Sequence, residues 1–386
     1  MSYGFFLFGR KNSENLIILY LINSVMSSSQ EFPPDKWFEV LFGFKEVPRD
    51  VAKHFQLQEF PDHVQITSKD NNKSYNAGNF QIRSCTSFSI GDGEGQLKKR
   101  GNGTLNLIHG YGFDSEKFEL IDVLSSQSLP QWNGATFQAA SNFNCLEFVS
   151  SSQTASSGIT NYFYDTTQGP YCAIGAGPAI LYRNYFIKHH GKVGQLEKEI
   201  NLLERTPLKI KGGYPLIHDP KELESLDFDW DNLDNWPVGV HRNCEVTMTR
   251  GDRGFKLAPP NQIVHHVYAA AFNFYGSVRQ CDFTINLSRK LLAAEYRATI
   301  LAAWENSQLF PGLPGSNVCI LTQLGGGVFG NPKEIICEAI ESCMDIIVDS
   351  GLTVYVCCFS DSSFKDVNSI LGKYVKETGG TILETK

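Results

Sequence analysis

Residues 318–334 read VCILTQLGGGVFGNPKE, and this stretch decides the fold. An apolar run, Val318–Leu321, precedes a loop that contains four glycines. Asn331 is a favourable N-cap residue, Pro332 suits the first position of a helix, and Glu334 stands three residues after the cap. The stretch therefore predicts a buried strand, a Gly-rich loop and a helix that starts at Pro332.

The segments around this stretch alternate between strand and helix patterns. Residues 263–274 and 352–359 are apolar, β-branched runs, whereas residues 287–305 and 363–376 repeat apolar side chains at helical spacing. The helix after the glycine loop is expected to extend over residues 332–348. Such alternation predicts an α/β fold with a mainly parallel sheet and helices on both faces.

The chain divides into three expected parts. Residues 1–30 form a tail that we expect to be disordered. Residues 31–130 consist of short apolar runs separated by Gly, Asn and Asp clusters, which predicts a β-rich N-terminal region. Residues 131–386 predict an α/β domain with an insertion near 206–261, where turn-forming and acidic residues are dense.

The composition is that of a globular protein: 42% of the residues are hydrophobic, and the formal net charge is −7. An acidic chain is a poor match for general nucleic-acid binding, which needs a basic face. The ten cysteines form no CxxC pair and lie largely in apolar runs, which favours a reducing compartment, cytoplasmic or nuclear, and no metal site. The apolar segment Leu16–Ile22 is too short to span a membrane. We therefore expect no membrane contact and no cofactor.

The glycine loop has the chemistry of a phosphate-binding site. Its backbone amides would lie at a helix N-terminus and outside the carboxyl end of a strand, where α/β sheets bind ligands. It is not a Walker A loop, because no Lys-Ser or Lys-Thr follows the last glycine. Gly325, Gly327 and Gly330 satisfy GxGxxG, but Gly330 precedes the expected helix instead of lying in it, which is unlike a dinucleotide-binding fingerprint. A Rossmann-type NAD-dependent oxidoreductase is therefore the second interpretation of this loop.

The loop and the strand after it resemble the closing half of a macro domain. The residues that carry the resemblance are Gly327-Val-Phe-Gly-Asn-Pro332 and the strand Val354–Phe359. In macro domains, such a loop receives the diphosphate and distal ribose of ADP-ribose. Residues 135–142, ATFQAASN, are similar to the family's strand that ends in Asn-Ala-Ala-Asn near the ribose, and residues 168–177 take the place of its first Gly-rich loop. The resemblance covers roughly residues 132–362 and implies a macro-domain-like fold.

The resemblance also implies a ligand and a set of contacts. The ligand would be ADP-ribose or a related nucleotide diphosphate, either free or carried by an ADP-ribosylated protein. The expected ligand-binding residues are Gly325, Gly326, Gly327, Val328, Phe329, Gly330, Asn331, Gln138, Asn142, Gln168 and Gly169.

The sequence leaves open whether the site is catalytic. Gln138 and Ser141 stand where the family's two asparagines are expected, and the paired glutamates of poly(ADP-ribose) glycohydrolases do not follow residues 325–327. The first hypothesis is an ADP-ribosyl hydrolase with Asp165 as the candidate catalytic residue, since it stands where it would orient a water. A role of Asp165 in capping the turn competes with that assignment. The departures from the family pattern favour the alternative, a non-catalytic reader of ADP-ribosylated protein.

Overall fold

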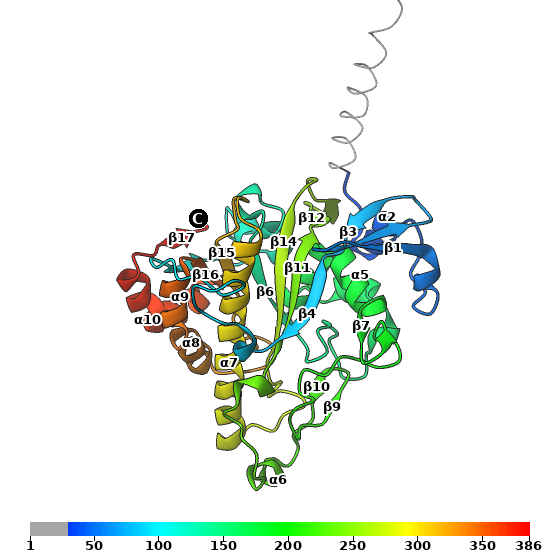
Figure 1. Cartoon of the computed structure of the whole chain (residues 1–386). Coiled ribbons are helices and arrows are strands. Elements are labelled where there is room, and N and C mark those ends of the chain that lie inside the picture. Colours follow the sequence, from blue (N-terminus) through cyan, green and yellow to red (C-terminus); the bar gives the residue numbers. More distant parts are fainter. Residues whose placement is uncertain (1–29) are drawn as a thin grey trace, which may run out of the picture.

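The computed structural model describes residues 30–386, so the expected tail lies outside the described residues except for residue 30. A large sheet of eight strands forms the centre of this part of the chain (Figure 1). In spatial order, the strands are β17 (Ile382–Glu384), β5 (Thr104–His109), β16 (Thr353–Cys358), β15 (Val318–Leu321), β6 (Thr136–Ser141), β14 (Ile263–Ala270), β11 (Val238–Glu245) and β4 (Asn79–Arg83).

The six strands from β17 to β14 run parallel to one another. Counting β5, β6, β14, β15, β16 and β17 as 1 to 6, their spatial order is 6-1-5-4-2-3. A dinucleotide-binding sheet has the order 3-2-1-4-5-6, so the sheet does not have the topology that the Rossmann-type interpretation requires. β11 and β4 extend the sheet as antiparallel strands.

Helices cover both faces of the sheet. One face carries α3 (Val123–Ser126), α4 (Gln168–Gly175) and α5 (Gly177–Tyr185). The other carries α7 (Asp282–Leu309), α8 (Lys333–Glu341), α9 (Met344–Ser350) and α10 (Asp361–Glu377), and the long α7 runs lengthwise beside the strands in Figure 1. This arrangement confirms the predicted α/β fold class. Among residues 30–386, no helix is both long and apolar enough to cross a membrane.

The helix expected over residues 332–348 is divided into α8 and α9. Between them, Ser342 Oγ and Cys343 Sγ both donate hydrogen bonds back to the carbonyl oxygen of Ala339. Such side-chain contacts compete with the backbone hydrogen bonds of a continuing helix. The helical periodicity itself was predicted correctly on either side of the break.

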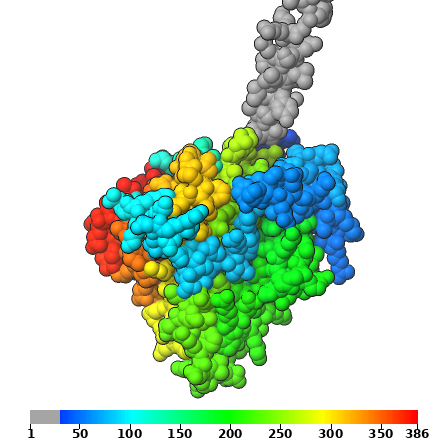
Figure 2. Space-filling model, in the orientation of Figure 1, coloured from blue at the N-terminus to red at the C-terminus, as the bar shows by residue number. Residues whose placement is uncertain are grey.

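The first part of the expected β-rich region, residues 30–76 (the N-terminal region), forms a small antiparallel sheet, as the sequence predicts. It contains α2 (Trp37–Phe42), β1 (Phe55–Glu59), β2 (Val64–Ser68) and β3 (Ser74–Asn76). Trp37, Phe38 and Leu41 share one buried cluster with Ile174 of α4 and Ile180 of α5. Figure 2 shows the N-terminal region in close contact with the rest of the molecule.

The main sheet also draws on regions outside the expected α/β core. β4 and β5 precede residue 131, and β11 lies within residues 206–261. The remainder of residues 206–261 forms short elements, namely β9 (Ile210–Lys211), β10 (Tyr214–Pro215), α6 (Pro220–Glu224), β12 (Met248–Arg250) and β13 (Phe255–Leu257). A further pair, β7 (Lys188–His189) and β8 (Lys192–Val193), follows α5.

Candidate functional site

A cavity of about 750 Å³ opens at the carboxyl ends of three neighbouring parallel strands, β6, β14 and β15. β6 pairs with β15 only at Thr136 and Phe137, and the ladder ends there. Beyond that point, the side chain of Gln168 makes the hydrogen bonds to β6 that a neighbouring strand would make. Its Oε1 accepts from Ala140 N at 2.7 Å, and its Nε2 donates to Gln138 O at 2.8 Å. In open α/β sheets, ligands bind outside the carboxyl ends of the strands, which is where this cavity lies.

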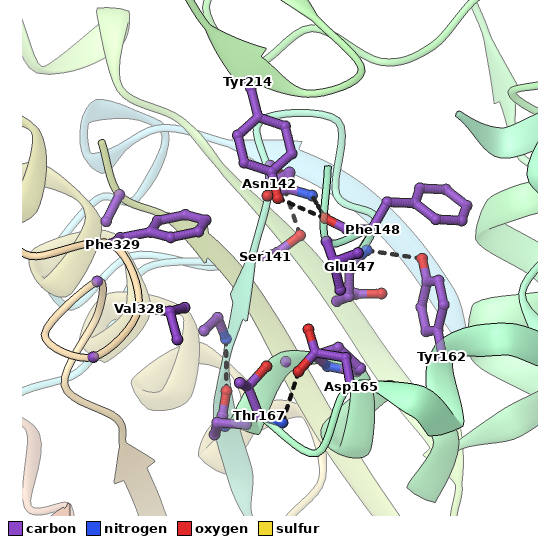
Figure 3. Close-up of a pocket in the computed structure, with 18 of the residues that line it drawn as sticks. Ser141, Asn142, Glu147, Phe148, Tyr162, Asp165, Thr167, Tyr214, Val328 and Phe329 are labelled. Atoms are coloured by element: carbon purple, nitrogen blue, oxygen red, sulfur yellow. Dashed lines mark hydrogen bonds between the residues drawn. The ribbon is translucent and has the colours of Figure 1, made fainter. Parts of the chain in front are cut away.

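The glycine loop forms one wall of the cavity (Figure 3). Gly325, Gly327, Val328 and Phe329 line it, and the backbone amides of these four donate no hydrogen bond to another described residue. Gly325 and Gly330 have φ angles of 67° and 71°, a left-handed conformation that glycine adopts without strain. Neighbouring unpartnered amides in such a turn form a concave site for an anion.

Asn331 holds the loop in this shape instead of capping the helix. Its Nδ2 donates to Phe272 O at 2.7 Å, and its Oδ1 accepts from Ser288 Oγ of α7 at 2.7 Å. α8 begins at Lys333 with Pro332 as the N-cap residue and without a side-chain cap, so the predicted cap was wrong. The loop lines the cavity with residues 325 and 327–329, whereas the start of α8 does not line it.

The prediction of a first Gly-rich loop at residues 168–177 was also wrong, because this stretch is helical and forms α4 and the start of α5. Its glycines permit close packing: a Cβ at Gly169 would lie 1.8 Å from Ala140 O. Only the first turn, residues 168–170, lines the cavity, and the N-cap residue Thr167 makes no side-chain cap. The positive end of the α4 dipole is therefore presented to the cavity.

Asp165 lies across the cavity from Val328 and Phe329 (Figure 3). It follows the short 3-10 helix η7 (Thr160–Tyr164), and its Oδ1 accepts a hydrogen bond from Thr167 N at 2.9 Å. The turn-capping contact is thus present. Oδ2 makes no hydrogen bond with another described residue, so one carboxylate oxygen is available to a ligand.

A third side of the cavity contains Asn142, Phe148 and Tyr214. Asn142 Nδ2 donates to Phe148 O at 2.7 Å, and the Tyr214 hydroxyl donates to the same carbonyl at 2.7 Å. Burial raises the pKa of Tyr214 to about 12, so its hydroxyl keeps the proton that it donates. The ring centroid of Phe329 lies 5.9 Å from that of Tyr214, which connects this side to the glycine loop.

Four of the expected ligand-binding residues lie off the cavity, namely Gln138, Gly326, Gly330 and Asn331. Gln138 is fully buried. Its Nε2 donates to Thr299 Oγ1 of α7 at 3.0 Å, and its Oε1 accepts from Thr322 N at 3.2 Å. The side-chain amide of Gln138, which was expected to contact the ribose, therefore links β6 and the residue after β15 to α7.

Gly326 and Gly330 are closely approached by neighbouring side chains. A Cβ at Gly326 would lie 2.9 Å from Ile336 Cδ1, and a Cβ at Gly330 would lie 2.6 Å from the ring of Tyr275. The other seven expected residues, Gly325, Gly327, Val328, Phe329, Asn142, Gln168 and Gly169, all line the cavity together with Asp165.

Several lining residues were missed because their segments carried no functional signal in the sequence. They are Gln153, Ser157, Gly158, Asn161, Tyr162, Tyr164 and Tyr214. The aromatic-rich run of η7, directly before Asp165, is the signal that would have pointed to three of them, Asn161, Tyr162 and Tyr164. Tyr214 lies in the region expected to be an insertion, and nothing local distinguishes it.

The cavity has acidic residues but no basic side chain. Asp165 and Glu147 line it, whereas none of its lining residues is Lys, Arg or His. An anionic ligand would therefore be held by backbone amides, and the part of it beside Asp165 would be neutral. Among residues 30–386, no group of three His, Cys, Asp or Glu side chains is arranged to hold a metal ion.

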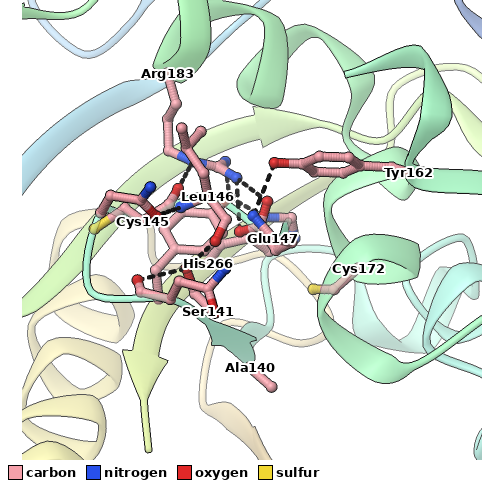
Figure 4. A network of polar contacts seen from close by, with 12 residues as sticks. Ala140, Ser141, Cys145, Leu146, Glu147, Tyr162, Cys172, Arg183 and His266 are labelled. Carbon is pink, nitrogen blue, oxygen red and sulfur yellow. Dashed lines mark hydrogen bonds and ion pairs between the residues drawn. The ribbon is translucent and has the colours of Figure 1, made fainter. Parts of the chain in front are cut away.

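Glu147 is enclosed beside the cavity by a buried polar network (Figure 4). Arg183 Nη2 lies 3.0 Å from both of its carboxylate oxygens, and Glu147 N donates to the Tyr162 hydroxyl at 2.8 Å. Arg183 also donates to the Tyr268 hydroxyl. Burial raises the pKa of the Glu147 carboxyl to about 7, although the charge of Arg183 acts in the opposite direction. Because this carboxyl is not exposed, Asp165 is the accessible acid of the cavity.

No protein-family model matches the sequence, and no curated protein matches it. Among solved structures, the chain is similar to the poly(ADP-ribose) glycohydrolase from Thermomonospora curvata, with a TM-score of 0.37 and 11% identity over 86% of this chain and 95% of that chain. It is also similar to the poly(ADP-ribose) glycohydrolase from Deinococcus radiodurans in complex with ADP-ribose, with a TM-score of 0.37 and 10% identity over 72% of this chain and 87% of that chain. Both similarities are distant.

Proposed function

We propose that the cavity binds ADP-ribose or a related nucleotide diphosphate. The observation that carries the proposal is the wall of unpartnered amides at residues 325 and 327–329. Amides in a concave loop bind phosphate oxygens without a basic side chain, and the first turn of α4 adds a helix dipole. A volume of about 750 Å³ also lies within the range of small-molecule sites.

The charges in the cavity indicate how such a ligand would lie. The diphosphate belongs at the glycine loop, because the amides there are the available donors. The distal ribose is neutral and rich in hydroxyl groups, so it fits the end near Asp165, whose Oδ2 would accept a ribose hydroxyl. Placing the diphosphate at that end instead would bring like charges together.

Exposed aromatic rings at the same edge of the sheet offer a place for the base. Phe359 follows β16 and Phe113 lies after β5; their exposed fractions are 44% and 83%, and their ring centroids are 5.7 Å apart. Gln323 lines the cavity and its Nε2 donates to Cys357 O of β16 at 3.1 Å, so one lining residue lies beside the strand that leads to Phe359. We infer that the base stacks on Phe359.

Hydrolysis of an ADP-ribosyl linkage is a second function, favoured by the free Oδ2 of Asp165. Asp165 would take a proton from a water whose oxygen attacks the anomeric carbon of the distal ribose. The bond from that carbon to the attached group then breaks, and the leaving group takes up a proton. Assaying the release of ADP-ribose from an ADP-ribosylated protein separates this hydrolase from a non-catalytic reader, which would bind without turnover.

Calorimetric titration of the purified protein tests the binding proposal. We expect saturable binding of ADP-ribose and weaker binding of AMP, which lacks the second phosphate and the distal ribose. A preference for NAD would show that a related dinucleotide is the better ligand, and a complete lack of ADP-ribose binding would overturn the proposal.

A further inference from the structure

The carboxylate of Glu46 reaches from the N-terminal region to the start of η7. Its Oε1 accepts a hydrogen bond from Ile159 N at 2.9 Å. Its Oε2 accepts from Thr160 N at 2.7 Å and from Thr160 Oγ1 at 2.6 Å. The hydroxyl of Tyr185 in α5 donates to the same carboxylate. Both carboxylate oxygens of Glu46 therefore accept hydrogen bonds from the start of η7, and one of them also accepts from α5.

These contacts make Glu46 a helix cap supplied from a distant part of the chain. The N-cap residue of η7 is Ile159, which offers no side-chain acceptor. Amides in the first turn of a helix need an acceptor from outside the helix, and a carboxylate is favoured there. Gly158 permits the approach, since it has a φ of 80° and a Cβ there would lie 2.7 Å from Glu46 Oε2.

η7 carries much of the cavity wall that faces the glycine loop. Asn161, Tyr162 and Tyr164 of η7 line the cavity, and so does Asp165 directly after it. Asp165 N donates to Tyr162 O at 3.1 Å, so the position of the aspartate depends on the end of η7. A shift of this short helix would move every one of these side chains.

A second contact from the N-terminal region supports the same segment. Trp37 Nε1 donates to Thr160 O at 2.9 Å, and the Trp37 side chain is fully buried. Glu46 and Trp37 thus hold the amide and the carbonyl of a single residue from two directions. The N-terminal region contacts the cavity wall directly, although Glu46 itself does not line the cavity.

We propose that Glu46 is a positioning residue for the ligand site: it fixes η7 so that Tyr162 and Asp165 take the places that the ligand requires. The inference rests on the proposed binding function and gives the N-terminal region a role in it. Glu46 acts through η7 and touches no ligand atom.

Hydrogen exchange and ligand titration, both carried out on Glu46→Ala and a control variant, test the positioning role of Glu46. In Glu46→Ala without ligand, we expect the amides of residues 159 and 160 to exchange faster by roughly fivefold or more, the factor that corresponds to the loss of a helix cap. At a temperature where the variant is fully folded, its affinity for ADP-ribose should fall by a similar factor. Glu39→Ala is the matched control, because Glu39 lies in α2 and pairs only with Lys36 on the surface.

Unchanged exchange at residues 159 and 160 would overturn the inference, and so would faster exchange with an unchanged affinity. Trp37→Phe provides a second variant, since it removes the hydrogen bond to Thr160 O together with part of a fully buried ring and should have an effect in the same direction. Failure of the proposed function would be recognised separately, because the wild-type protein itself would then show no binding of ADP-ribose.

Discussion

Arg183 Nη2 lies 3.0 Å from both carboxylate oxygens of Glu147, and neither side chain is exposed. The pair stands directly behind the cavity, where Glu147 N also holds the hydroxyl of Tyr162. A buried ion pair adds little net stability compared with apolar packing, but breaking it leaves one charge buried without its partner. The wall of the cavity is therefore sensitive to any change at either residue.

Above pH 7, where the Glu147 carboxyl is ionised, Glu147→Ala should lower the free energy of unfolding by about 3–5 kcal/mol, because Arg183 would be left uncompensated in the core. Urea unfolding of the variant and the wild-type protein measures the difference. Glu338→Ala is the control, since Glu338 forms an exposed pair with Arg289 and should have little effect. A loss for Glu147→Ala no larger than that of the control would contradict the assignment.

The same carboxyl predicts a pH dependence of stability. Burial raises the pKa of Glu147 from 4.5 to about 7, so between these pH values the folded state holds a proton that the unfolded state has lost. Its contribution is therefore fully present below pH 4.5 and is lost as the pH rises toward 7. The stability of the wild-type protein relative to Glu147→Gln should fall over that range and stay level above it. A difference that rises with pH would be inconsistent with this shift.

Asp165→Asn separates hydrolase from reader. Asparagine keeps the acceptor that Thr167 N uses, so the turn should persist while the carboxylate is lost. If the protein is a hydrolase, turnover should fall by roughly 10²–10⁴-fold, as expected for the loss of a general base, whereas ADP-ribose affinity should fall far less, by the one ribose hydroxyl that Oδ2 would accept. Turnover that survives the substitution would rule out Asp165 as the base.

Phe359→Ala tests where the base lies. Loss of a stacking ring should weaken the binding of ADP-ribose and of AMP by about 1–3 kcal/mol. The affinity for ribose 5-phosphate, which has no base, should not change. Phe60→Ala is the control, because Phe60 is an exposed ring next to the small N-terminal sheet. Equal weakening of all three ligands would place the base elsewhere.

Local signals in the sequence predicted one part of the site, namely the strand and glycine loop with the helix after them. The strand, glycine loop and helix of residues 318–341 follow from residue type and spacing alone, because each is encoded by its own neighbours. Glycines were harder to interpret. Gly325 bends the loop, whereas Gly169 lies in a helix next to Ala140 O, and only the folded chain supplies that neighbouring atom.

Side chains at strand ends are also hard to assign from the sequence, because their neighbours are known only in the folded chain. Asn142 and Gln138 both carry an amide near the end of β6, yet Asn142 lines the cavity and Gln138 points to Thr299 of α7. Tyr214 and the residues of η7 reach the cavity from segments with no motif of their own. Local sequence patterns do not predict contacts that depend on long-range packing.

Titration of Gly327→Glu with ADP-ribose tests the central claim most directly. A Cβ at Gly327 would have no heavy atom within 4 Å, so the substitution should leave the fold intact while placing a carboxylate among the amides that would hold the diphosphate. Gly327→Ala is the matched control. We predict saturable binding of ADP-ribose by the wild-type protein and by Gly327→Ala, and no measurable binding by Gly327→Glu. Equal binding by all three proteins, or by none, would contradict a phosphate site at the glycine loop.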